Sequence, residues 1–535
     1  SYLSDIIDYA LSNTEKEIAI AKKLPYWSHN EANDKNSISL SSKRIKIIFI
    51  IPLLLNINIS HSFNNTVTDN ENYEAQANIY PASFFTQYQP QSAMDMVARI
   101  PGFSFNHGSN ARGFGGNSGN VLIDGARPTA KSGGLEGALK RISAAQVKMI
   151  EIIRGGAGEA AGHSVVANVI RDKNITTGSW ASKFRIAPDG KVMPNIEAAV
   201  TTNMNDWDIS VDIDIGGRPN SRTAVIEDLN AENELTSSSA ELFKDQSEWV
   251  FANGEGISVL NGGKLAINSR LGGDVWKGDT HRDIFSHHLP DGSMPESYSQ
   301  LNEKKKFKMA EIGLDWTKSY QIWKWHVVGL GLINDRQYEY QLDESDLLNE
   351  LSQSGFKQDR LKTELIARTT LSMLDLEQIK PEFGIEIAHN RLDTAASETE
   401  SGLTTSVEGA DVIVEELRGE FFTTFSYQLN PLLSFEGGLT AEFSTISVSG
   451  DSEQEQSFQF IKPRLSASYK INDKNNITLE AEHRVGQLDF NDFSVSTEAS
   501  DDSTTSGNPD LKPDQKTRLV TTYGWSFSER GSLKV

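Results

Sequence analysis

The stretch VKMIEIIRGGAGEAAGHSVVANVI, residues 147–170, decides how the chain is interpreted. An apolar run with strand character stands directly before a glycine-rich loop, as it does in dinucleotide-binding folds. Such folds also need a helix after the loop and an acidic residue about 20 positions further on. Here Gly162 and β-branched residues follow the loop, and the nearest acid beyond them, Asp172, is too close. We therefore expect a β-strand followed by a tight turn, with no dinucleotide and no other cofactor.

Composition excludes several classes of function. The 535-residue chain has 51 basic and 73 acidic residues and a formal net charge of −22, which argues against a nucleic-acid partner. It has no cysteine, so disulfides, thiolate metal sites and cysteine nucleophiles are excluded. No Ser-His-Asp set or pair of carboxylates stands out, and we expect no enzyme. His281, His287 and His288 are interpreted as a polar loop rather than a metal site.

Residues 42–62 have the pattern of a secretory signal peptide. The basic residues Lys43, Arg44 and Lys46 precede the apolar run IIFIIPLLLNINI, and small residues follow it. A spanning helix needs roughly 18–20 apolar residues, more than this run supplies. A buried core segment is the alternative. Residues 1–41 are interpreted as a doubtful N-terminal extension.

A compact mixed α/β region is expected from residue 82 to residue 175. QSAMDMVARIPG, residues 91–102, predicts a short amphipathic helix stopped by Pro101 and Gly102. GGLEGALKRIS predicts a second helix. Strands are expected at FSFN (residues 103–106), at NVLIDG and at VKMIEIIRG.

From residue 176 to residue 535 the apolar residues alternate with polar ones. In DWDISVDIDI, residues 206–215, one face is apolar and the other is acidic or carries serine, as in a strand with one wet face. NP at 430–431 and NDKN at 472–475 predict tight turns between long strands. Roughly 14–16 such strands, joined by alternating short and long connections, are typical of a transmembrane barrel. Interfacial aromatic girdles are predicted at Trp180, Trp207, Trp249, Trp323 and Trp525.

The opening stretch and its surroundings resemble the plug domain of TonB-dependent outer-membrane receptors. Arg112-Gly113 and the barrel-loop sequence GNPDLKP, residues 507–513, resemble further motifs of that family. Ser143, Gly156 and Ala167 depart from the usual residues and indicate a divergent branch. The plug motif is carried by Ile123-Asp124-Gly125, by Ile142 with Val147, by Ile150-Glu151, by Arg154-Gly155 and by Ala167-Asn168-Val169-Ile170.

The resemblance implies a small α/β plug domain, residues 82–175, inside a large antiparallel transmembrane β-barrel, residues 176–535. A complete barrel of this kind has roughly 22 strands, so the resemblance implies a chain truncated at its C-terminal end. Residues 63–81 would be a flexible periplasmic segment. The implied location is the cell outer membrane of a Gram-negative bacterium. The implied partners are TonB with its inner-membrane energising complex, outer-membrane lipid and a small extracellular ligand.

The same resemblance implies the site residues. Arg112 and Arg154 would face carboxylates on the inner barrel wall, for which Glu442, Glu480 and Glu482 are candidates by their parity along the strands. The alternative is that the two arginines only cap the plug fold. Thr66, Val67 and Thr68 form the candidate TonB-contact segment. The plug motif and plug–barrel contacts are assigned to Arg112, Gly113, Asp124, Gly125, Glu151, Arg154 and Gly155.

The implied function is energy-coupled uptake of a scarce ligand, foremost an iron chelate. Cobalamin, carbohydrates and other metals stay open as cargo. A barrel for carbohydrate uptake, or for surface binding and signalling without import, is the alternative. A soluble nucleotide-binding oxidoreductase is a third hypothesis, and it would need further β-α units that the alternating pattern lacks.

Overall fold

The computed structural model describes two groups of elements, a small domain and a large sheet. The expected extension at 1–41 and signal peptide at 42–62 lie outside the described residues, as does most of the segment at 63–81. The described residues are 78–101, 103–107, 119–126, 134–154, 165–172, 176–285, 295–346, 351–374, 376, 379–407, 409–472, 474–498, 503–505, 507–508, 510–528 and 531–535.

The small domain is built on a four-stranded sheet in the order β1-β3-β4-β2. Its strands are β1 (Asn78–Pro81), β3 (Val147–Arg154), β4 (Val165–Arg171) and β2 (Val121–Ile123). β3 is antiparallel to both β1 and β4, whereas β2 runs parallel to β4. The expected strand in the opening stretch is therefore confirmed. The strand after its glycines is antiparallel to β3, whereas a dinucleotide fold places a helix there.

Three short helices and two 3₁₀ turns pack on this sheet. The helix α3 begins with a capping box, because Ser92 Oγ accepts from the Asp95 amide while Asp95 Oδ2 accepts from the Ser92 amide. Both expected helices are confirmed. No helix in the described ranges is long and apolar enough to span a membrane. The helical elements are α2 (Ala82–Phe85), η1 (Thr86–Tyr88), α3 (Ala93–Val97), α4 (Gly134–Arg141) and η2 (Ala144–Gln146).

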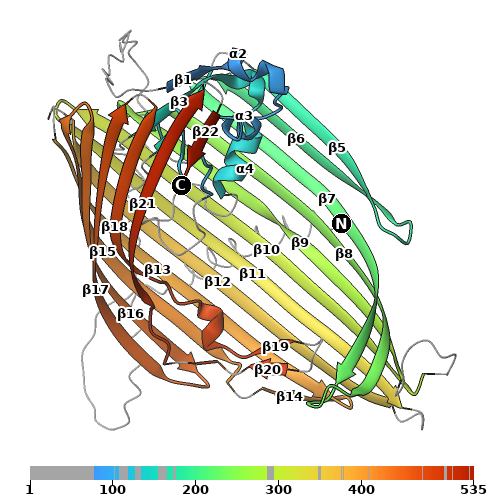
Figure 1. Cartoon of the computed structure of the whole chain (residues 1–535). Helices are drawn as coiled ribbons and strands as arrows, with labels where there is room; N and C mark the ends of the chain where they lie inside the picture. Colours follow the sequence, from blue (N-terminus) through green and yellow to red (C-terminus); the bar gives the residue numbers. More distant parts are fainter. Residues whose placement is uncertain are drawn as a thin grey trace, which may run out of the picture. The chain divides into compact units, whose positions relative to one another are not determined.

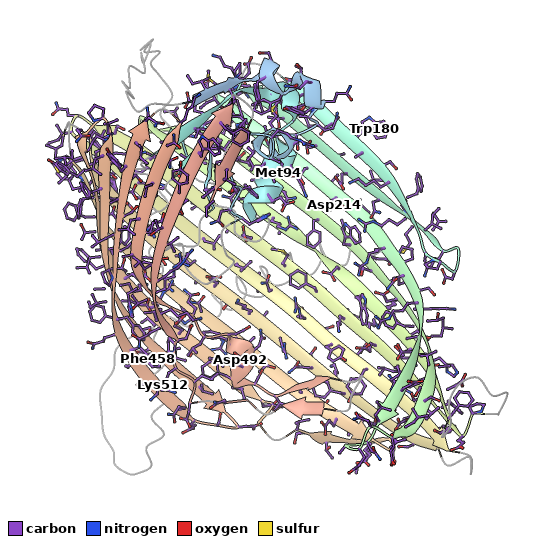
Figure 2. The ribbon with its side chains drawn as sticks, in the orientation of Figure 1. Met94, Trp180, Asp214, Phe458, Asp492 and Lys512 are labelled. Atoms are coloured by element: carbon purple, nitrogen blue, oxygen red, sulfur yellow. The ribbon has the colours of Figure 1, made fainter. Side chains whose placement is uncertain are left out.

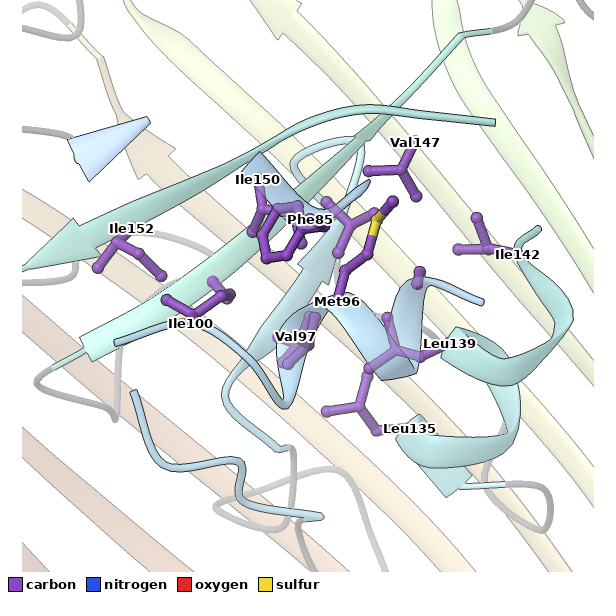
Figure 3. Packing of buried hydrophobic residues seen from close by; sticks show 14 residues of the cluster. Phe85, Met96, Val97, Ile100, Leu135, Leu139, Ile142, Val147, Ile150 and Ile152 are labelled. Atoms are coloured by element: carbon purple, nitrogen blue, oxygen red, sulfur yellow. The ribbon is translucent and has the colours of Figure 1, made fainter. Parts of the chain in front are cut away.

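One apolar cluster joins these helices to the sheet. Leu139 of α4 and Phe85 of α2 have no exposed surface, and Ile150 of β3 has none either. Figure 3 shows these three side chains converging with those of α3 on one face of the sheet. Burial of such side chains contributes about 1.5–3 kcal/mol each. The small domain is thus held together by its own core.

The prediction of a strand at FSFN is wrong. Residues 103–107 have no regular secondary structure, and the chain there is bonded to Asn120, whose backbone amide donates to the Asn106 carbonyl at 3.3 Å. Its Oδ1 accepts from the Asn106 amide at 2.8 Å, and its Nδ2 donates to the Ser104 carbonyl at 2.8 Å. A side-chain amide satisfies the backbone here without a ladder.

In the part of the chain that the structure describes, the large sheet contains 16 strands, in agreement with the expected number, and Figure 1 shows most of them side by side. Its order runs from β22 to β5, and among the described residues no pairing joins these two edge strands. Its strands are β5 (Thr177–Ile186), β6 (Val192–Met204), β7 (Trp207–Leu229), β8 (Leu235–Leu260), β9 (Gly263–Phe285), β10 (Ser297–Tyr320), β11 (Trp323–Asp346), β12 (Leu351–Met373), β13 (Ile379–Glu400), β14 (Leu403–Ser406), β15 (Val412–Asn430), β16 (Leu433–Gly450), β17 (Gln454–Asn472), β18 (Asn475–Val485), β21 (Gln515–Ser528) and β22 (Gly531–Lys534). The remaining elements are η4 (Phe490–Phe493), β19 (Ser496–Glu498) and β20 (Ser503–Thr505).

Asparagine side chains fix two of the turns that the sequence predicts. Between β15 and β16, Asn430 Oδ1 accepts from the Leu432 amide at 2.9 Å. Between β17 and β18, Asn472 Oδ1 accepts from the Lys474 amide at 2.9 Å. Asparagine favours turns because its side chain bonds the backbone two residues on. Both predicted hairpins are confirmed.

The predicted alternation is confirmed in β7. One of the tryptophans predicted for the girdle, Trp249 of β8, lies on the wrong face for it. Ile213 is exposed on one face, and Asp214 on the other accepts a hydrogen bond from Trp249 Nε1 at 2.9 Å. Trp249 therefore lies on the polar face and does not belong to an outer girdle. It fits there because its cross-strand neighbour is Gly216, whose added Cβ would come within 2.7 Å of the indole ring. Trp180 of β5, in contrast, is 80% exposed (Figure 2).

The buried position of Leu139 predicts a large stability effect. Leu139→Ala should destabilise the small domain by about 2–5 kcal/mol, because it leaves a cavity in the core. The control is Lys140→Ala on the exposed face of the same helix, which should change stability by less than about 0.5 kcal/mol. Hydrogen exchange of β3 and β4 amides in the whole chain measures both. Equal protection in the two variants would contradict the assigned core.

Candidate functional site

Asp124 and Gly125 form a tight turn at the end of β2. Their φ angles are 50° and 78°, and the Ile123 and Ala126 amides donate to each other's carbonyls at 2.8 and 3.1 Å. Two consecutive residues with positive φ are typical of a two-residue hairpin turn, in which glycine and aspartate are favoured. The sequence Ile-Asp-Gly therefore directs the Asp124 side chain by backbone geometry.

Asn168 of β4 links this turn to β3. The Gly125 amide donates to Asn168 Oδ1 at 2.8 Å, and Asn168 Nδ2 donates to Glu151 Oε2 at 3.2 Å. Three residues assigned from the sequence, Asp124, Gly125 and Glu151, are thus brought together. The connecting residue, Asn168, had been assigned only as part of the strand motif.

Arg171, at the end of β4, completes the arrangement. Its Nε donates to Asp124 Oδ2 at 2.8 Å, and its backbone amide donates to Asp124 Oδ1 at 2.9 Å. Both side chains are buried, with 7% and 8% of their surface exposed. Burial lowers the pKa of the Arg171 guanidinium, but the carboxylates of Asp124 and Glu255 outweigh that effect and raise its pKa above the ordinary value.

Arg171 also reaches the large sheet, and two further contacts do the same. Its Nη1 lies 3.5 Å from a carboxylate oxygen of Glu255 on β8. Arg141, in the last turn of α4, lies 3.2 Å from Asp212 on β7. Lys264 of β9 donates to the Asp124 carbonyl at 3.5 Å. We call the face of the large sheet that carries Asp212 and Glu255 the inner face, and the opposite one the outer face.

A second group of charges lies on the inner face further along the sheet. Glu386 of β13, 1% exposed, accepts from Arg368 at 3.3 Å and from Arg418 at 2.9 Å. Lys462 of β17 donates to Glu420 at 2.9 Å and to Glu442 at 2.7 Å. Buried charges are stable only when they are paired, and each of these has an opposite charge within 3.3 Å. The cluster thus forms a stiff polar band across five strands, β12, β13 and β15–β17.

Several predicted site residues lie outside what the structure describes. These are Arg112, Gly113, Gly155 and the segment Thr66, Val67 and Thr68; Arg154 ends β3, and only its backbone is described. Of the candidate wall carboxylates, Glu442 pairs with Lys462, and Glu482 pairs with Arg484 and Arg518. Their pairing with the two predicted arginines stays a prediction.

The sequence reasoning missed Arg141 and Arg171, which carry the described ion pairs between the two parts. Arg171 directly follows the strand motif that ends at Ile170, and Arg141 stands in the last turn of a predicted helix. Both are cations at the edge of an assigned element. The aspartate of the Ile-Asp-Gly turn was the available signal, because a buried carboxylate requires a cationic or donor partner.

Comparison with known protein families identifies the type of the small domain. Residues 69–168 match the family described as TonB-dependent Receptor Plug Domain. This part of the chain is a domain of the TonB-dependent receptor plug type. The resemblance found in the sequence is thereby confirmed, and so is the predicted fold of a small plug followed by a large antiparallel sheet. The small domain is called the plug from here on.

The solved structures that match the chain do so at low similarity. The ferric preacinetobactin receptor BauA of Acinetobacter baumannii is 9% identical, with 85% of this chain and 69% of that chain covered and a TM-score of 0.41. The siderophore receptor PiuA of the same species is 10% identical, with 86% and 71% covered and a TM-score of 0.38. The copper transporter OprC is 12% identical, with 84% and 69% covered and a TM-score of 0.38. No curated protein sequence matches the chain.

The ion pair between plug and sheet predicts a measurable coupling. In a double-mutant cycle of Arg141→Gln and Asp212→Asn, the two changes should be non-additive by about 0.5–3 kcal/mol, since the pair is partly shielded from water. The measurement is the urea concentration at which the plug becomes accessible to protease. The control cycle uses Lys183 and Glu197, an exposed pair on β5 and β6, for which coupling should be below about 1 kcal/mol. Additive effects at Arg141 and Asp212 would show that the contact does not hold the plug.

Proposed function

We propose that the protein is an outer-membrane receptor that takes up a scarce extracellular ligand with energy supplied through TonB. The observation that carries this proposal is the plug domain itself, tied by Arg141 and Arg171 to carboxylates on the inner face of the large sheet. A domain held in this way obstructs the inner face until its contacts are broken.

The outer face supports a location in a bilayer. On β11 the outward residues from Trp325 to Ile333 are apolar or glycine, and from Asp335 onwards they are polar or acidic. The apolar part covers nine residues, 325 to 333, and a strand that crosses a membrane needs about 9–11. Neighbouring strands continue the apolar belt with exposed Leu365, Ile385 and Phe421. In water such a belt would favour aggregation.

The inner face supports a plug that is held and then released. Among the described residues, its contacts with the plug include two ion pairs and a hydrogen bond. Such contacts are specific in direction and are lost one at a time when the chain is pulled. A force applied at the N-terminal side of the plug would act first on β1, which within the described residues pairs with β3 alone, through residues 78–81.

TonB is the proposed partner, and it would bind the segment Thr66, Val67 and Thr68. This segment precedes β1 and has weak strand character. Partner proteins often bind such segments by adding them as a strand to a sheet edge, so that main-chain hydrogen bonds supply the affinity. The position before β1 transmits a pull directly to the plug sheet.

A substitution in this segment tests energy coupling. Val67→Pro should abolish ligand uptake, because proline removes a main-chain donor and resists strand pairing, while ligand binding at the cell surface should persist. Val67→Ala is the control and should retain most uptake. Uptake and surface binding are measured with a radiolabelled ligand in cells that express the full chain. Undiminished uptake by Val67→Pro would refute the assigned segment, and uptake that is also independent of TonB would refute the function.

The cargo that we propose is an iron chelate, the class that the family resemblance implies first. Cells expressing the receptor should then take up ferric chelates under iron limitation, and unlabelled oligosaccharides should not compete. Uptake is measured with radioactive iron, with cells lacking the receptor as the baseline. Competition by oligosaccharides without any iron uptake would favour the alternative of carbohydrate transport.

A further inference from the structure

Two arginines stand side by side on the inner face beyond the apolar belt. Arg336 of β11 is directly opposite Arg360 of β12 in the strand register. Across neighbouring strands, Asp212 is paired with Asn253, Asn253 with Arg270, Arg270 with Glu311, and Glu311 with Leu332. Because Asp212 lies on the inner face, Leu332 and the other even-numbered residues of β11 lie there too. On the outer face at this level stands Asp335, so the arginines lie where the sheet has already left the apolar belt.

The arrangement is unfavourable for the protein alone. Like charges directly opposite each other in a sheet repel, and the charge of Arg336 acts unfavourably on Arg360. Neither guanidinium forms an ion pair with a described carboxylate, although Asp274 and Asp489 lie within electrostatic range. The arginine pair stands in a chain whose net charge is −22. Two guanidinium groups without an ion-pair partner among the described carboxylates therefore stand beside each other, and Arg336 is exposed.

Unsatisfied polar groups surround the pair. Lys362, two positions from Arg360 on the same face, forms no ion pair within the described part of the chain. Thr394, opposite Arg360 on β13, is 2% exposed, and its Oγ1 has no hydrogen-bond partner. Arg360 Nε and Asn334 Oδ1 are likewise buried without partners among the described groups. The two guanidinium groups and the Lys362 ammonium bring more donors to this place than these acceptors can satisfy.

Aromatic rings border the pair on the other side. The Arg336 guanidinium lies 5.4 Å from the centroid of the Phe307 ring. Two register positions further on, on the same face, Lys305 Nζ lies 4.6 Å from the Trp276 ring and 4.9 Å from the Tyr338 ring. Such contacts orient cations without neutralising them, so the donors stay available to a ligand.

The segment around η4 covers Arg360. Asn491 Oδ1 accepts from Arg360 Nη1 at 3.3 Å, and the Val495 carbonyl accepts from Gln358 at 2.9 Å. Phe490 and Phe493 anchor this segment in an apolar cluster on the inner face. The amide oxygen of Asn491 is a neutral acceptor in the place where an anionic oxygen would bind more strongly.

We propose that Arg336 and Arg360, with Lys362 beside them, form a binding site for an anionic chelate whose oxygen anions are held by both guanidinium groups. Guanidinium groups match carboxylate and phenolate oxygens in geometry and keep their charge at any physiological pH. An anion between the two arginines would turn their repulsion into shared attraction. On binding, it would displace Asn491 from Arg360. The inference rests on the proposed function in one respect, because it takes this anion to be the transported ligand.

The test uses the purified full chain in detergent and two iron chelates of opposite charge. Wild type should bind ferric citrate, an anionic carboxylate chelate, and should bind the cationic ferrioxamine B complex at least about tenfold more weakly. Arg336→Gln and Arg360→Gln should each weaken ferric citrate binding at least about tenfold and leave the cationic chelate unaffected. The matched control is Lys357→Gln on the outer face of β12, where the lysine pairs with Asp359. It should bind as wild type does.

Asn491 supplies an independent test that leaves the arginines intact. Asn491→Asp places a carboxylate beside Arg360 and should weaken ferric citrate binding several-fold, whereas Asn491→Ala should bind at least as well as wild type. Equal affinity of Asn491→Asp and Asn491→Ala, or failure of wild type to bind ferric citrate, overturns the proposed site. Ligand binding to the purified chain is measured without TonB. A loss of uptake in Val67→Pro cells whose ligand binding is intact therefore bears on the proposed function and not on the anion site. Uptake of a cationic chelate by wild type would overturn the anion site and leave that function standing.

Discussion

Every strand of the large sheet carries two kinds of side chain in alternation, and the rest of the structure depends on this constraint. In β7, Ile213 must lie on the outer face if Asp212 and Asp214 are to lie on the inner one, because the side-chain period is two. Shifting one strand by a single residue would place its carboxylates in the apolar belt. The ion pair of Asp212 with Arg141 and the hydrogen bond of Asp214 with Trp249 exist only in the observed register. Plug contacts and the proposed membrane position therefore follow from the same pairing.

The inner face combines charges in two different ways. Around Glu386, Arg418 and Lys462 the opposite charges are paired, and the side chains are largely buried. At Arg336 and Arg360 the charges are alike, and Arg336 is open to solvent. The charges of the paired cluster neutralise one another, whereas those of the arginine pair would be neutralised by the proposed anion. This contrast separates the parts of the wall that maintain structure from the part that we assign to recognition.

Much of the fold could be predicted from the sequence, because its strongest signals are periodic. The alternation in DWDISVDIDI and the asparagine turns at Asn430 and Asn472 depend on neighbours in the chain, and the structure confirms them. FSFN was mispredicted because its partner is Asn120, fourteen residues from Asn106, which no local pattern reveals. Arg171 was missed for a similar reason, since its partner Glu255 lies on a distant strand. Local order can be read from a sequence, but which distant charges meet depends on the strand register.

The docking of the η4 segment has a consequence for the order in which the chain folds. Nearly all contacts of the large sheet join strands that are consecutive in the chain, so the sheet can form by adding one hairpin after another. The bond between Gln358 and Val495 closes a separation of 137 residues, and the bond between Arg360 and Asn491 closes one of 131. Contacts of such separation carry a large entropic cost until the intervening strands are in place. The segment over Arg360 is therefore expected to settle last in folding and to detach first when the protein is destabilised.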